Sequence, residues 1–158
     1  MTEIELMQRI KSILDTEIIP HIGIFKDDEI KVFLHDIPMS SDFETDDSDD
    51  EKYFPCCIVR LNGGEISNAG EPQKTTVEII VCIKDWSEDM SGYQKLVIIL
   101  NRIRDYFTSN YGIRNKFRLQ YPVKTSISDE TATPYFVGSI TTNWIVDIKP
   151  YEDINKFL

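Results

Sequence analysis

The sequence contains little that would mark an enzyme, a secreted protein or a membrane protein. It has only two histidines and three cysteines among 158 residues, and no phosphate-binding pattern surrounds Gly63-Gly64. No apolar run approaches the roughly 20 residues that a membrane-spanning helix needs, and the N-terminus lacks the basic segment and apolar core of a secretion signal. We therefore expect the protein to stay in the compartment where it is made.

The three cysteines do not form a disulfide framework. Cys56 and Cys57 are neighbours in a predicted strand, so their side chains leave on opposite faces, and Cys82 stands alone. An odd number of cysteines without a spaced framework is typical of reduced, structural thiols in a cytosolic protein.

No set of residues has the spacing of a catalytic or metal site. The least unfavourable enzymatic set is Cys57 or Cys82 as nucleophile with His35 as base, but nothing in the spacing brings these residues together. His21 and His35 also lack partners at the spacing of metal ligands. We therefore predict no enzyme activity, no cofactor, and no catalytic, cofactor-binding or metal-binding residues.

Acidic residues are concentrated in one segment. The net charge is −10, and seven of the ten residues from Asp42 to Glu51 are acidic, so the other 148 residues carry only −3. We predict a mobile, solvated loop at 39–52 within a single α+β domain of residues 1–158. Calcium binding is an alternative for this loop, although it lacks the glycine that the turn of an EF-hand requires.

Hydrophobic periodicity predicts two helices. Ile4, Met7, Ile10, Leu14 and Ile18 form an approximate helical stripe, which indicates a helix over about Glu3–Glu17 that Pro20 ends. The second helix begins at Ser91, which has capping-box spacing to Gln94, and runs to about Asn110. Its apolar face is formed by Leu96, Leu100, Ile103 and Phe107, and Gly112 has the position of a left-handed residue that closes the last turn.

Alternating apolar residues predict the strands. The clearest case is Thr75–Lys84, in which Val77, Ile79, Val81 and Ile83 share one face. A turn at Asn62-Gly63-Gly64 and a second break at Asn68–Gln73 precede it. The other expected strands are His21–Phe25, Ile30–His35, Phe54–Leu61, Phe117–Ser128 and Tyr135–Lys149. Together these elements predict an α+β fold with a mostly antiparallel sheet of about four to six strands, packed on two helices that lie on one face.

Basic residues gather around the end of the second helix. This region is either an ordinary solvated surface or a counter-surface for an acidic region of a neighbouring subunit. The candidate subunit-interface residues are the acidic Asp46, Asp47, Asp49, Asp50 and Glu51 and the basic Arg102, Arg104, Arg114, Lys116 and Arg118.

The order of these elements resembles that of a known family. Tyr53–Val59, Thr76–Val81, the turn Asp85-Trp86-Ser87 with the long helix after it, and Tyr135–Ile140 resemble the layout of the tail terminator and tail completion proteins of long-tailed bacteriophages and prophages. The similarity covers most of residues 1–148 and is one of pattern, without an identifying motif. The acidic loop and the early strand pair depart from it, which leaves open a neck or head-tail connector protein.

The resemblance implies a structural, non-enzymatic virion protein. Such a subunit assembles as a six-fold ring at the head-proximal end of the tail, contacts the tail tube protein and the head connector protein, and joins tail to head. DNA passes through the ring without being specifically bound. The expected location is the virion tail, after assembly in the bacterial host cytoplasm. A third hypothesis is an acidic protein-binding module that mimics nucleic acid, which would require an ordered acidic segment.

Overall fold

The computed structural model describes residues 2–23, 30–36, 54–86, 91–113, 116–128 and 134–146. The predicted acidic loop at 39–52 lies outside the described residues. The helical elements are α1 (Thr2–Ile13), a π-helical turn η1 (Leu14–Ile18), a 3-10 turn η2 (Ile19–His21) and α2 (Ser91–Ser109). The strands are β1 (Lys31–Leu34), β2 (Cys56–Glu65), β3 (Gln73–Lys84), β4 (Gly112–Ile113), β5 (Phe117–Ile127) and β6 (Tyr135–Val146).

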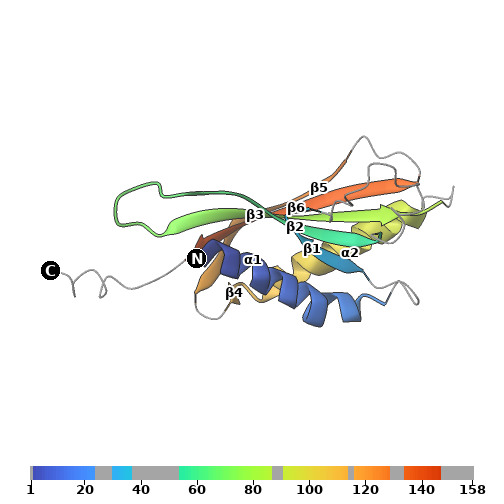
Figure 1. Ribbon diagram of the computed structural model, residues 1–158, viewed down its shortest axis with the longest axis horizontal. Helices are drawn as coiled ribbons and strands as arrows, with labels where there is room; N and C mark the ends of the chain where they lie inside the picture. The colour runs from blue at the N-terminus through green and yellow to red at the C-terminus, as the bar shows by residue number, and fades with distance from the viewer. Residues whose placement is uncertain are drawn as a thin grey trace, which may run out of the picture.

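The described strands form one sheet in the order β1-β2-β3-β6-β5-β4. Only β1 and β2 are parallel, and the other neighbouring strands are antiparallel. Both α-helices pack on the same face of this sheet (Figure 1). The predicted α+β fold, with a mostly antiparallel sheet and two helices on one face, is confirmed.

The first helical region differs from the prediction at both ends. Ile4 is 45% exposed, and Leu6 takes its place among the buried residues of α1. Pro20 does not end the helical region, because Ile19 before it keeps helical angles of φ −59° and ψ −44°. Pro20 is the second residue of η2, and proline is tolerated in the first turn of a helix. The predicted strand His21–Phe25 is therefore wrong at its start, since His21 is helical, and residues 24 and 25 lie outside the described residues.

The predicted turn at Asn62-Gly63-Gly64 is also wrong. β2 continues to Glu65, and its register with β3 shifts between Leu61 and Gly63, where Gly63 has a φ of 136°. Glycine permits this bulge without breaking the strand pair, because it has no side chain to strain at positive φ. The chain reverses later, between β2 and β3, and this hairpin projects beyond the N-terminal end of α1 (Figure 1).

The core lies between the helices and one face of the sheet. The predicted apolar residues of α2 are at most 1% exposed, as are Val77, Ile79, Val81 and Ile83 of β3. Gly138 of β6 lies close to α2, since a Cβ built there would meet Leu100 Cδ1 at 2.7 Å. The predicted left-handed cap at Gly112 is wrong, because this residue belongs to β4 and pairs with Arg118. Among the described helices, none is long and apolar enough to cross a membrane.

Candidate functional site

The sheet has a second face that is turned away from both described helices, which we call the helix-free face. Its side chains alternate in the strands with those of the core. Near β1 it carries a small apolar cluster in which Cys56, Ile58 and Cys82 are buried. Near the β2–β3 hairpin it is polar. The helix-free face therefore has an apolar half and a polar half.

A groove of about 410 Å³ lies in the polar half. Its lining residues come from four strands and are Asn62, Gly63, Gly64, Glu65, Lys74, Thr76, Gln120, Tyr121, Pro122 and Asn143. Thr76 Oγ1 donates to Asn143 Oδ1 at 2.8 Å, and Asn143 Nδ2 donates to the Pro122 carbonyl at 3.2 Å. Tyr121 is largely exposed to solvent, at 73%. Neutral hydrogen-bonding groups, the charged Glu65 and Lys74 and one exposed aromatic ring suit this groove to contact with a polar surface.

Cationic side chains outnumber anionic ones on the helix-free face. Strand register places Lys31, Arg60, Lys74, Lys84, Arg118 and Lys124 there, against Glu65 and Glu78. Lys74, Arg118 and Lys124 form no ion pair with any described residue. The described part of this face is therefore positive in a chain whose net charge is −10.

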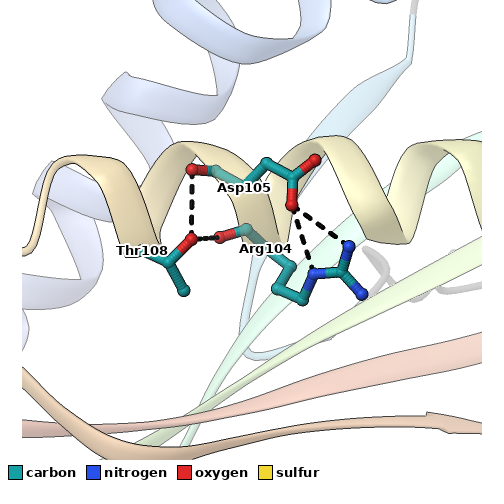
Figure 2. Close-up of polar contacts among 3 residues, drawn as sticks. All are labelled: Arg104, Asp105 and Thr108. Carbon is teal, nitrogen blue, oxygen red and sulfur yellow. Dashed lines mark hydrogen bonds and ion pairs between the residues drawn. The ribbon is translucent and has the colours of Figure 1, made fainter.

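The predicted basic region is divided in the structure. Arg104 Nη2 lies 3.1 Å from Asp105 Oδ1, and the Thr108 hydroxyl donates to the Arg104 and Asp105 carbonyls one turn back (Figure 2). Lys116 Nζ pairs with Glu5 Oε1 of α1 at 3.3 Å. Both cations therefore already have anionic partners within the subunit.

The remaining basic candidates lie on different surfaces. Arg102 is exposed on α2 and borders a pocket of about 320 Å³ with Glu17 and His21, whereas Arg118 lies on the helix-free face. Arg114 and the acidic candidates Asp46, Asp47, Asp49, Asp50 and Glu51 lie outside the described residues. The structure therefore does not gather Arg102, Arg104, Lys116 and Arg118 into one patch.

Two of the cysteines face one another, which the sequence analysis missed. Cys56 and Cys82 are direct partners in the β2–β3 register, so Cys82 does not stand alone. A hydrogen bond with Cys82 and burial both raise the pKa of the Cys56 thiol, while the same hydrogen bond lowers the pKa of Cys82. Only the register between β2 and β3, which the sequence alone does not give, places Cys56 beside Cys82.

The structure separates the residues of the least unfavourable enzymatic set. Cys57 belongs to the core between sheet and helices, whereas Cys82 belongs to the cluster on the helix-free face. His35 follows β1, and its backbone N–H donates to the Val59 carbonyl at 2.8 Å. Among the described side chains, no hydrogen bond joins either thiol to His35. The described residues also contain no group of three or more potential metal ligands.

The buried Cys57 thiol predicts a stability change at alkaline pH. Burial, with smaller contributions from Cys82 and Asp15, raises its pKa from 9.0 to about 12. Below pH 9 the thiol is protonated in both states, so its contribution to stability is complete. Between pH 9 and 12 only the unfolded state ionises, and the free energy of unfolding falls by about 1.4 kcal/mol per pH unit.

Chemical denaturation at pH 8 and pH 10 tests this expectation. The wild-type chain should lose about 1.4 kcal/mol more between the two pH values than Cys57→Ala does, because the variant lacks the thiol. Equal losses in the two proteins would show that Cys57 does not titrate in this way.

No protein-family model matches the chain, and a search of curated proteins finds no match. The geometry of the described surfaces therefore has to carry the functional assignment.

Proposed function

We propose that this chain is a structural, non-enzymatic protein of a long-tailed bacteriophage or prophage. In this proposal it assembles as a ring, six-fold in symmetry, at the head-proximal end of the tail and joins tail to head. Its partners are further copies of itself, the tail tube protein and the head connector protein, and DNA passes through the ring without specific binding. The virion tail is then its final location, after assembly in the host cytoplasm.

The observation that supports this proposal most directly is the difference between the two faces of the sheet. One face is closed by α1 and α2, whereas the polar half of the other presents a groove of about 410 Å³ that no described helix covers. A subunit whose function is contact needs a rigid layer that presents such a surface, and the helix-backed sheet provides one.

The positive charge of the helix-free face favours one kind of partner over another. Lys74, Arg118 and Lys124 would attract the phosphates of DNA, which must move through a ring without being held. We therefore assign the groove to a protein partner at one end of the ring. The lumen belongs to another surface of the subunit.

Complementary charge between subunits remains part of the proposal. The acidic candidates Asp46, Asp47, Asp49, Asp50 and Glu51 carry five negative charges. Arg102 and Arg118 are the basic candidates that have no described ion-pair partner, so they are the better counter-charges. Association that depends on them should weaken as salt screens the charges.

Light scattering on the purified chain, alone and with tail tubes of the encoding phage, tests the proposed function. At 50 mM salt we expect a particle of about 110 kDa, six times the 18.3 kDa of one chain, or the same ring on the tube ends. Raising the salt to 500 mM should weaken association, and Arg102→Glu with Arg118→Glu should mimic that effect.

The matched control is Lys11→Glu, because Lys11 lies on α1 and already pairs with Asp15 at 2.9 Å. This control should assemble as the wild type does. A chain that stays monomeric at every salt concentration and also ignores tail tubes would contradict the proposed ring. Binding to heads in preference to tails would identify a neck or connector protein instead.

A further inference from the structure

The two outer edges of the sheet are both partly unpaired within the described residues. β1, at one edge, has four residues and pairs only with β2. At the other edge, β4 covers β5 only at Phe117 and Arg118. Beyond them Leu119 N donates to the Tyr111 carbonyl at 2.7 Å, and the rest of β5 has no outer neighbour among the described strands. Such edges offer backbone groups to another chain.

Hydrogen bonds reveal which residues of each edge point outward. Lys31 N donates to the Pro55 carbonyl at 3.1 Å and His35 N to the Val59 carbonyl at 2.8 Å, so alternate residues of β1 face β2. The N–H groups of the residues between them, Val32 and Leu34, therefore face away from the sheet.

The edge formed by β5 has the same alternation. Ser128 N donates to the Val137 carbonyl at 2.9 Å, so Ser128 faces β6, as do Lys124 and Ser126. Thr125 and Ile127 then direct their N–H and C=O groups outward. Each edge thus presents two outward-facing residues that are separated by one inward-facing residue.

Strand register places the two edges at the same height in the sheet. One row of neighbouring residues runs Val32, Cys57, Val81, Gly138 and Ile127. The next such row runs Leu34, Val59, Ile79, Ile140 and Thr125. A second copy placed beside the first, without a shift along the strands, would bring Val32 opposite Ile127 and Leu34 opposite Thr125.

The directions of the two edge strands also match. β1 runs parallel to β2, and three antiparallel steps lead from β2 to β5, so β1 and β5 run in opposite directions. Their union would be an antiparallel ladder. Val32, Leu34 and Ile127 all pack against the helix-side core, so the apolar layer would continue across the junction.

Only a short part of each edge is available for pairing with another chain. A register shift between Gln120 and Lys124, together with Pro122, disrupts β5 before Thr125. Bulges, prolines and lysines are features that block edge pairing, so they confine it to the end of β5. That short end matches the four residues of β1.

We propose that β1 of one copy pairs with the end of β5 of the next copy, with Val32 opposite Ile127 and Leu34 opposite Thr125. Val32 offers both backbone groups, and Leu34 offers its N–H and the second lone pair of its carbonyl, whose first lone pair accepts from Asp36 N at 2.8 Å. Because the two edges differ, the contact is head-to-tail and repeats from copy to copy, which closes a ring when the rotation allows it. This inference rests on the proposed ring and names the contact that builds it.

The decisive variant is Thr125→Pro, which removes an outward N–H without removing a bond to β6. Proline is tolerated at such edge positions, so the subunit should fold with an unchanged melting temperature. Thr125→Ala, which keeps the N–H, is the matched control. We expect neighbour association to weaken about tenfold or more in Thr125→Pro and to stay at the wild-type level in Thr125→Ala.

Covalent trapping tests the register directly. Opposed residues in an antiparallel ladder have Cα atoms about 5.5 Å apart, within the range that a disulfide spans. Mixing Leu34→Cys chains with Thr125→Cys chains under oxidation should give a disulfide-linked dimer. Leu34→Cys mixed with Ser67→Cys should not, because Ser67 lies in the β2–β3 hairpin.

The outcomes separate this contact from the proposed function. Rings that form normally with Thr125→Pro and give no Leu34–Thr125 cross-link would overturn the edge pairing and leave the ring intact. Open filaments that give the cross-link would support the pairing and contradict the ring. A wild-type chain that remains monomeric with and without tail tubes would overturn both.

Discussion

Replacing Trp144 by alanine should lower the free energy of unfolding by about 3–5 kcal/mol. Trp144 is completely buried, and its ring packs edge-to-face on Phe107 of α2, with ring centres 5.7 Å apart. The alanine variant would lose this contact between sheet and helix and leave a cavity that the surrounding strands cannot close.

Polar contacts add to the loss. Trp144 Nε1 donates to Thr142 Oγ1 at 2.8 Å, and Thr142 Oγ1 donates to the Val77 carbonyl at 2.7 Å. Thr142 is itself fully buried, so this short chain of hydrogen bonds joins β6 to β3 inside the core. Without the indole, the Thr142 hydroxyl keeps only its bond to Val77.

Thermal and chemical denaturation would measure both contributions. For a chain of this size, the alanine variant should melt roughly 6–20 °C lower than the wild type. Trp144→Phe should recover most of the packing but not the hydrogen bond. The adjacent Ile145→Ala, on the helix-free face, is the control and should cost much less. Equal losses for Ile145→Ala and Trp144→Ala would contradict this account of the core.

The elements that the sequence predicted correctly are those whose periodicity is strong. In β3 and α2 the apolar residues recur at intervals of two and of three to four, and these intervals alone determine which side is buried. The same pattern failed in α1 at Ile4, where Leu6 supplies the buried residue instead. A stripe of a few residues fits more than one helical face, and the sheet decides between them.

The bulge in β2 was not predictable from local sequence. Asn62-Gly63-Gly64 has the composition of a turn, and the residues that follow it are polar. Pairing with β3 keeps these residues in the sheet as far as Glu65, because each added pair satisfies further backbone groups. Tertiary pairing therefore overrides the local preference at this position.

The candidate surfaces show why nearness in sequence does not predict a patch. Arg102 and Arg104 are two residues apart on a helix, so they point to different sides of α2. Lys74 is 44 residues before Arg118 in the sequence, yet it shares the helix-free face with Arg118 and Lys124, since only β6 lies between β3 and β5. Only the strand order, which sequence alone does not supply, places Lys74 on the same part of the sheet as the two cations of β5.

Gly138→Ala should destabilise the fold by about 1–3 kcal/mol, although alanine is normally the better strand residue. The added Cβ would lie 2.7 Å from Leu100 Cδ1 and 3.1 Å from the Ser126 carbonyl oxygen. Leu100 is 1% exposed and has little room to move away, so α2 must shift from β6. Gly112→Ala is the control and should be nearly neutral, because a Cβ there meets nothing within 4 Å.

A double-mutant cycle identifies the clash as the cause. Leu100→Ala alone should cost about 2–5 kcal/mol, because it leaves a cavity. In the double variant the new methyl group of Gly138→Ala occupies part of that cavity, so the combined loss should fall short of the sum by about 1 kcal/mol or more. Strict additivity would mean that the helix and strand do not meet at this point. A shortfall would establish that the absence of a side chain at Gly138 sets the distance between α2 and the sheet.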